Sequence, residues 1–306
     1  MRNHKISLIF LTIIRAAKSD NSINQKLHPF FGFTSIAYGS GFFPTFADMS
    51  SAAEQNHLIG LLGFPLGHSF STAYFNEKFR VEKLTDWEYR ILELNNIEGL
   101  KEQIQAEKNW LGFNVTIPHK KSIIRFLDSI DPLAARIGAV NTVKILPNGK
   151  WRGFNTDYEG LKLSLIGWLP ASLWKNKNAL IIGNGGAAAA AEVVLQDLGI
   201  NYQIVARNPR QGQLYANGLN PSFFRRADLI LQCTPLGMAP DINEIPPFPK
   251  TGFRKGQRVL DLIYNPEQTL FLQQAEKAGA STRNGLAMLL IQAEKAWEIW
   301  TAAQEA

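Results

Sequence analysis

From Leu58 onward, short apolar runs alternate with longer segments in which apolar residues recur at helical spacing. This alternation is typical of an α/β protein with mostly parallel sheets. The apolar runs predict strands near residues 58–63, 87–94, 110–116, 139–146, 151–155, 178–182, 202–206, 228–232 and 258–262. The helical spacing predicts helices near residues 72–83, 96–107, 120–128, 131–136, 186–198, 267–278 and 286–302. The stretch from Gly167 to Asn178 contains a proline and several polar residues, so we expect the chain to cross there between two domains.

The first 48 residues do not follow this pattern. An apolar run from Ile6 to Ile14 follows basic residues, as in a signal peptide, but Arg15 comes directly after it. The run is also shorter than the roughly 20 residues that a membrane-spanning helix needs. Met49 lies shortly before the first predicted strand, so we expect it to be the natural start and residues 1–48 to be a non-native or disordered extension. A genuine leader is the alternative.

Composition and charge restrict the possible partners. The chain has 306 residues and a net charge of +6, but residues 1–48 carry five Lys and Arg against two Asp, which is half of that charge. No basic stripe with interleaved aromatic residues follows residue 48, so neither a nucleic-acid nor a membrane partner is expected. The single cysteine, Cys233, excludes an intrachain disulfide and suits the cytoplasm. The five histidines have no metal-binding spacing, so no metal is expected.

A glycine-rich loop follows the strand predicted at 178–182. Residues 183–188 read Gly-Asn-Gly-Gly-Ala-Ala and lead into an alanine-rich helix, a G-x-G-x-x-A match in its strand–loop–helix context. Glycines let the backbone approach a pyrophosphate, and a helix N-terminus offers free N–H groups. The next strand ends in Arg207 rather than in an acidic residue, which favours NADP over NAD. The alternatives are a glycine turn between buried elements and a solvated arginine.

Polar residues gather in four segments of the first half: GFPLGHSFS at 63–71, GFNVTIPHK at 112–120, GAVNT at 138–142 and GFNTD at 153–157. Lys120 follows the end of a strand, where open α/β sheets usually bind ligands. Taken alone, some of these residues could also have a purely structural role. Ser71 and Asp157 could cap the helices beside them, and Lys120 could lie on a solvated face.

The third and fourth segments flank Asn148-Gly149, the strongest short signal for a hairpin. If those two residues form the loop, Pro147 faces Lys150. Counting back then places Asn141 opposite Thr156 and Val140 opposite Asp157. The two polar segments should therefore meet at one end of the hairpin.

Taken together, these strings resemble the shikimate dehydrogenase family. The others that carry the resemblance are IIGNGGAA, CTPLGM, DLIYNPEQT and NGLAMLLIQA, and all occur in the family's order over about residues 58–302. The resemblance implies an α/β fold with a substrate-binding domain at 58–166, a Rossmann-type NADP-binding domain at 178–284 and a C-terminal helix at 285–303 that returns to the first domain. The interval from Arg210 to Asp228 is short, so the Rossmann-type domain should be trimmed there.

The resemblance also implies the function, the reversible NADPH-dependent reduction of 3-dehydroshikimate to shikimate, with Lys120 and Asp157 as the catalytic pair. The implied substrate contacts are Ser69, Ser71, Thr116, Asn141, Tyr264 and Gln292. The implied NADP(H) contacts are Gly183, Asn184, Gly185, Gly186, Ala187, Arg207, Thr234, Gly285 and Met288. A quinate/shikimate dehydrogenase and a catalytically silent NADP-binding homologue are the alternatives, and the protein could be a monomer or a homodimer.

Overall fold

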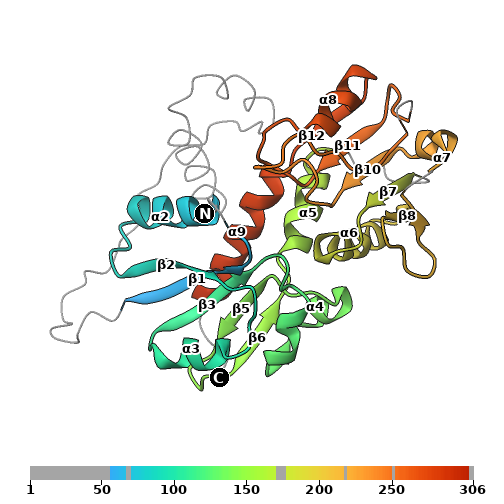
Figure 1. Ribbon diagram of the computed structural model, residues 1–306. Helices are drawn as coiled ribbons and strands as arrows, with labels where there is room; N and C mark the ends of the chain where they lie inside the picture. The colour runs from blue at the N-terminus through green and yellow to red at the C-terminus, as the bar shows by residue number, and fades with distance from the viewer. Residues whose placement is uncertain (1–55, 67–69, 170–176, 217–218, 250–251, 303–306) are drawn as a thin grey trace, which may run out of the picture.

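The computed structural model describes residues 56–66, 70–169, 177–216, 219–249 and 252–302. The segment 1–48, expected to be an extension, and the predicted substrate contact Ser69 lie outside the described residues. The described chain forms two lobes, each built on its own β-sheet (Figure 1).

The first sheet is mixed and has six strands in the order β2-β1-β3-β5-β6-β4. Its strands are β1 (His57–Gly63), β2 (Trp87–Glu93), β3 (Trp110–Val115), β4 (Ser129–Ile130), β5 (Thr142–Ile145) and β6 (Trp151–Phe154). Strand β5 runs antiparallel to both of its neighbours, and the other described pairs are parallel. The helices of this lobe are α2 (Phe70–Glu82), α3 (Leu100–Ala106), the 3-10 helix η2 (Ser122–Phe126), α4 (Pro132–Ile137) and α5 (Asp157–Ile166).

The second sheet is entirely parallel, in the order β12-β11-β10-β7-β8-β9. Its strands are β7 (Asn178–Ile182), β8 (Asn201–Ala206), β9 (Leu214–Tyr215), β10 (Leu229–Gln232), β11 (Arg258–Asp261) and β12 (Ser281–Arg283). Its helices are α6 (Gly186–Asp197), α7 (Pro221–Arg226) and α8 (Leu270–Lys277). Read from β9, this is the strand order of a Rossmann-type domain. Strand β9 and helix α7 are short, so the domain is reduced in the interval between Arg210 and Asp228, as the sequence predicted.

Two predicted helices differ from those observed. The segment 120–128 forms the 3-10 helix η2 instead of an α-helix, because its turn is tied to the neighbouring loop by bonds such as Val140 N–H to the Lys120 carbonyl (2.7 Å). The segment predicted at 96–107 becomes helical only from Leu100, since Gly99 has a φ of 78° and precedes the helix in a left-handed conformation.

The hairpin register predicted from Asn148-Gly149 is wrong by one residue. Thr142 pairs with Phe154, and the Leu146 N–H binds the Lys150 carbonyl, so the loop has three residues, 147–149. Gly149 takes a φ of 77°, as the last residue of a three-residue hairpin loop commonly does. The two polar segments still meet at the same end of the hairpin.

The C-terminal helix α9 (Leu286–Thr301) leaves the second lobe and packs on the first, between α2 and α5 (Figure 1). Its Trp300 indole donates to the Val143 carbonyl on β5 at 2.9 Å. The buried Lys144 ammonium donates to the carbonyls of Ile299 and Ala302, which lie at the helix C-terminus. Such contacts satisfy carbonyls that a helix end leaves free. The predicted return of this helix to the first domain is confirmed.

The lobes also meet where α5 packs on α6. The Tyr158 hydroxyl on α5 donates to Asp197 at 2.6 Å, and Arg136 on α4 donates to the same carboxylate at 2.7 Å. The catalytic candidate Asp157 directly precedes Tyr158. The junction between the lobes is therefore anchored one residue away from the proposed chemistry.

Candidate active site

Lys120 and Asp157 form an ion pair, with 2.6 Å between the Lys120 Nζ and the Asp157 Oδ2. The Lys120 side chain is 16% exposed and that of Asp157 is 7% exposed, so neither lies on a solvated face. The pair joins the loop after β3 to the first residue of α5. A half-buried ammonium held by a buried carboxylate is a suitable group for holding or transferring a proton.

Asp157 does not cap helix α5, although its sequence context alone suggests a cap. The Asn155 side-chain oxygen takes the helix N–H instead, accepting from Tyr158 N at 3.2 Å. Both carboxylate oxygens of Asp157 are engaged elsewhere: Oδ2 with Lys120, and Oδ1 with the amide of Asn141 at 3.0 Å. Asn155 therefore leaves Asp157 available to the site.

Asn141 connects the aspartate to the next part of the site. Its Nδ2 also donates to Thr156 Oγ1 at 3.0 Å and lies 3.4 Å from the Gln292 Oε1 on α9. Its side-chain oxygen accepts the backbone N–H of Thr156 at 2.7 Å. The structure thus brings four predicted site residues, Lys120, Asp157, Asn141 and Gln292, into one hydrogen-bonded group.

A second series of hydrogen bonds connects helix α2 to the same region. The buried Tyr89 hydroxyl donates to Asn114 Oδ1 at 3.3 Å, and Asn114 donates to the Asn141 carbonyl at 3.3 Å. Burial raises the pKa of the Tyr89 phenol, and a hydrogen bond with the Ser71 side chain opposes that rise. Ser71 is the second residue of α2, so it bonds to Tyr89 from inside the helix rather than capping it.

Sequence reasoning did not select Tyr89 or Thr156 as site residues. Tyr89 sits in a strand whose residues look like ordinary core and surface positions, and an aromatic residue there is unremarkable. Its partner Asn114 could have indicated it, because a buried amide needs polar neighbours.

Thr116 and Tyr264 lie at two other edges of this region. A Cβ on Gly63 would lie 2.5 Å from the Thr116 Cγ2, so the half-buried threonine packs directly on the end of β1. The Tyr264 ring stands edge-on to Phe70 at the start of α2, with 5.5 Å between the centroids. Burial raises the pKa of the Tyr264 phenol. Tyr264 follows β11, so the second lobe contacts α2 beside Ser71.

The glycine loop lies between β7 and α6, as predicted. Gly183 has a φ of 109°, and a Cβ there would lie 3.0 Å from the Thr234 Cγ2, so the loop has no room for a side chain at this point. A Cβ on Gly185, the N-cap of α6, would meet open space. A Cβ on Gly186 would lie 3.2 Å from the Lys120 side chain. The loop therefore packs against Lys120 at Gly186 and has open space at Gly185.

The other predicted cofactor contacts lie on several different elements. Asn184 donates to the Asn208 carbonyl at 2.9 Å. This bond fixes the segment after β8, whose first residue is the exposed Arg207. Gly285 is the N-cap of α9 and has no room for a Cβ, which would lie 2.0 Å from the Leu262 carbonyl. Ala187 is half-buried in the first turn of α6. Met288 is buried against Gly160 on α5.

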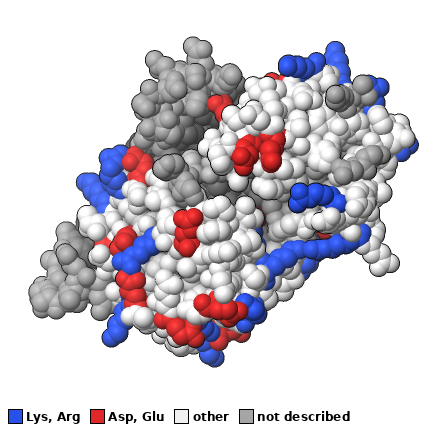
Figure 2. All heavy atoms as spheres, in the orientation of Figure 1, with Lys and Arg blue, Asp and Glu red and all other residues white. Residues whose placement is uncertain are grey.

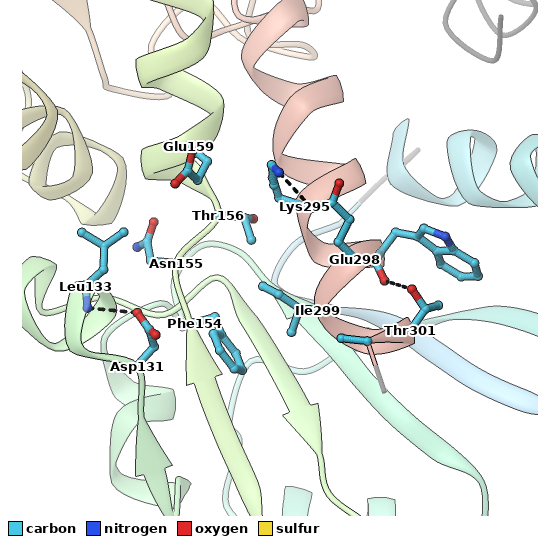
Figure 3. A pocket seen from close by; sticks show the side chains of 12 residues that line it. Asp131, Leu133, Phe154, Asn155, Thr156, Glu159, Lys295, Glu298, Ile299 and Thr301 are labelled. Atoms are coloured by element: carbon cyan, nitrogen blue, oxygen red, sulfur yellow. Dashed lines mark hydrogen bonds and ion pairs between the residues drawn. The ribbon is translucent and has the colours of Figure 1, made fainter. Parts of the chain in front are cut away.

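A pocket of about 670 Å³ lies beside Asn155 and Thr156, the two residues that precede Asp157 (Figure 3). Its walls come from Asp131, Leu133, Phe154, Asn155, Thr156, Glu159, Lys295, Trp297, Glu298, Ile299, Thr301 and Ala302. Figure 3 shows Glu159 on α5 and Lys295 on the neighbouring helix α9. The pocket touches the site through Thr156 but contains neither Lys120 nor Asp157, so we do not assign the substrate to it.

Within the described ranges, no three His, Cys, Asp or Glu side chains cluster closely enough to hold a metal ion. No helix in the part of the chain that the structure describes is long and apolar enough to cross a membrane. Burial raises the pKa of the Cys233 thiol, which opposes thiolate formation. On the face shown in Figure 2, acidic and basic side chains are interspersed over the first lobe.

Residues 61–143 match the family model of the shikimate dehydrogenase substrate binding domain. Over 270 residues the chain is 39% identical to the NADP(+) shikimate dehydrogenase of Methanococcus aeolicus, covering 82% of this chain and 94% of the relative. The chain belongs to the shikimate dehydrogenase family. The resemblance seen in the sequence motifs is confirmed.

Solved structures of shikimate dehydrogenases have the same fold. One, in complex with NADP+, has a TM-score of 0.69 and 34% identity, covering 83% of this chain and 93% of its own. Another, from Thermus thermophilus and in complex with NADP(H) and shikimate, has a TM-score of 0.69 and 30% identity, covering 82% of this chain and 95% of its own. The predicted pairing of an α/β substrate-binding domain with a Rossmann-type domain is confirmed.

Proposed function

We propose that this family member catalyses the reversible, NADPH-dependent reduction of 3-dehydroshikimate to shikimate, a step toward chorismate and the aromatic amino acids. The observation that carries the proposal is the Lys120–Asp157 ion pair, whose half-buried lysine lies against Gly186 in the first turn of α6. Its relatives include shikimate dehydrogenases that are named as NADP(+) enzymes.

The glycine loop fits the cofactor. Gly183 holds a backbone conformation that favours glycine, and the open space at Gly185 lets a pyrophosphate approach the free N–H groups of α6. The exposed Arg207 follows the adjacent strand and suits the 2′-phosphate of NADP. We assign the remaining cofactor contacts to Asn184, Gly186, Ala187, Thr234, Gly285 and Met288.

Bound NADPH supplies a hydride to the ketone carbon of the substrate. The Lys120 ammonium stabilises the negative charge that develops on the ketone oxygen and donates the proton that makes the hydroxyl. Asp157 holds that ammonium in place, and Asn141 fixes the carboxylate in turn. In the oxidative direction, the same lysine accepts the proton.

The substrate's hydroxyl and carboxylate groups match the polar side chains around the pair. We assign the substrate contacts to Ser69, Ser71, Thr116, Asn141, Tyr264 and Gln292. The two serines favour shikimate over quinate, because the additional hydroxyl on carbon one of quinate needs room beside them.

The remaining assignments concern the context of the enzyme. We assign residues 58–166 to the substrate domain, 178–284 to the NADP domain and 285–303 to the returning C-terminal segment. We place the protein in the cytoplasm, as a monomer or homodimer, with no nucleic-acid or membrane partner.

The test is NADPH oxidation by the purified full-length protein with 3-dehydroshikimate, compared with reduction of NADP+ or NAD+ by shikimate and by quinate. Lys120→Met should lower kcat by about 10²- to 10⁴-fold, the usual contribution of a positioned acid or base. Lys101→Met is the matched control, because Lys101 pairs with Asp128 at 3.0 Å on the surface, away from the site. Unchanged turnover in Lys120→Met, or faster turnover with quinate than with shikimate, would refute the proposal.

A further inference from the structure

Helices α2 and α9 are joined by an ionic group outside the catalytic pair, in which a buried lysine meets partly buried glutamates. The Lys78 side chain on α2 is only 2% exposed, and its Nζ lies 3.1 Å from Glu294 Oε1 on α9. The same ammonium lies 2.9 Å from Glu82 and 5.2 Å from the centroid of the Trp297 ring. The hydroxyl of the buried Tyr74 also donates to Glu294. We call Tyr74, Lys78 and Glu294 the α2–α9 tether.

Stability alone does not account for this arrangement. Tyr74 belongs to a core of aliphatic and aromatic side chains from β1, β2, α2 and α9, in which apolar residues could have filled the space of the tether. Buried ion pairs are often no more stabilising than apolar residues of similar volume, and they are best known for fixing one alignment of packed elements. The burial of Tyr74 and the nearby Glu294 carboxylate raise the pKa of the Tyr74 phenol, which keeps it a neutral donor.

Both tethered helices carry proposed substrate contacts. Gln292 lies two residues before Glu294 on α9, and its side-chain oxygen is 3.4 Å from the Asn141 amide. Ser71 lies two helical turns before Lys78 on α2, about 10 Å along the helix. The tether therefore joins the same two helices that carry Ser71 and Gln292, at positions that follow these residues along each helix.

We propose that Tyr74, Lys78 and Glu294 are positioning residues that set the spacing between Ser71 and Gln292 and thereby the affinity for shikimate. This inference rests on the proposed function, because it takes Ser71 and Gln292 as substrate contacts. Within the described residues, no hydrogen bond or ion pair joins the tether to a residue assigned to the cofactor or to proton transfer. Loss of the tether should therefore affect shikimate binding and leave the chemical step nearly unchanged.

The experiment compares the wild-type enzyme with the triple variant Tyr74→Phe/Lys78→Met/Glu294→Leu, which removes every polar member of the tether together. The KM for shikimate should rise about three- to tenfold, the effect expected for one weakened hydrogen bond to the substrate. The KM for NADP+ and kcat should stay within about twofold of the wild-type values, a smaller change than the loss of a hydrogen bond would cause. Lys295→Met is the control, because Lys295 is the next residue on α9 but pairs only locally, with Glu298.

A triple variant that folds and keeps the wild-type KM for shikimate would overturn the inference, as would an equal rise in both KM values. If the triple variant does not fold, Tyr74→Phe alone should raise the KM for shikimate without changing that for NADP+, and no change would overturn the inference. A wild-type protein that does not turn over shikimate would refute the proposed function instead. In that case, amide hydrogen exchange over residues 70–82 measures whether the tether holds α2 in place, and exchange should become faster in the triple variant.

Discussion

The Asn141 amide donates to the Asp157 carboxylate at 3.0 Å, on the oxygen that Lys120 does not occupy. This contact links the end of the hairpin to the catalytic pair. Asp157 is thus held from two sides, which fixes the orientation of its carboxylate. The negative charge of the carboxylate attracts the Lys120 ammonium and holds it in the ion pair.

Replacing that charge tests the pair. Asp157→Asn keeps the shape of the side chain but removes the negative charge that holds the ammonium, so we expect kcat to fall by about 10²-fold or more. The KM for NADPH should not change. Asp128→Asn, which breaks the surface pair with Lys101, should leave kcat unaffected. Steady-state kinetics on both variants would check this, and equal kcat values for them would contradict it.

Gly112 on β3 marks how closely the returning helix approaches the first sheet. It has a φ of 156°, and a Cβ there would lie 2.1 Å from the Val143 carbonyl and 2.5 Å from the Trp300 Nε1. Gly112→Ala should therefore lower the free energy of unfolding by about 3 kcal/mol or more through overpacking. Gly99→Ala is the matched control, since Gly99 also has a positive φ but a Cβ there meets open space. It should cost only about 1–2 kcal/mol. Urea denaturation measures both, and similar losses would show that the close approach is not the cause.

Asp261, at the end of β11, should make stability depend on pH. Burial raises its pKa to about 6, although Thr269 and the Ile263 N–H donate to its carboxylate. The folded-state pKa exceeds the unfolded value, so the folded state binds more protons between these two pKa values. The free-energy cost of burying the charge is thus fully present above about pH 6 and is relieved as the pH falls toward 4.

The corresponding variant is Asp261→Asn, which cannot titrate. The free energy of unfolding of the wild type, relative to this variant, should increase by about 2 kcal/mol between pH 7 and pH 4.5. Urea unfolding at the two pH values gives the comparison. A difference that stays constant or decreases toward low pH would show that Asp261 has no raised pKa.

The sequence predicted the fold well where local pattern and packing agree. The strand predicted at 178–182 and the helix at 186–198 match β7 and α6 closely, because an apolar run, glycines and an alanine-rich segment all favour the same structure. The hairpin register was wrong because Asn-Gly also fits a loop with Gly149 in its third position. Which of these loops forms depends on the pairing of Leu146 with Lys150, which the dipeptide does not encode.

The site was predictable in its parts but not in its connections. Motifs selected Lys120, Asp157 and Asn141, yet no spacing along the chain shows that Asn155 supplies the helix cap and so leaves Asp157 available to Lys120. The tether on α2 and α9 was missed for a similar reason. Lys78 and Glu294 are 216 residues apart, and each looks like a surface charge until the helices are packed together.

Arg207 provides the test of cofactor choice. It is exposed directly after β8, beside the segment that Asn184 holds through the Asn208 carbonyl. Arg207→Ser removes a guanidinium that can pair with the 2′-phosphate of NADP, and a hydrogen bond to a charged group contributes about 1.5–3 kcal/mol. The KM for NADPH should therefore rise at least about tenfold, while the KM for NADH, which has no such phosphate, should change little. Arg125→Ser is the control, because Arg125 is an exposed arginine of the first domain that pairs with Glu98. Equal increases in the KM for NADPH and NADH would mean that Arg207 supports the loop rather than recognising the phosphate.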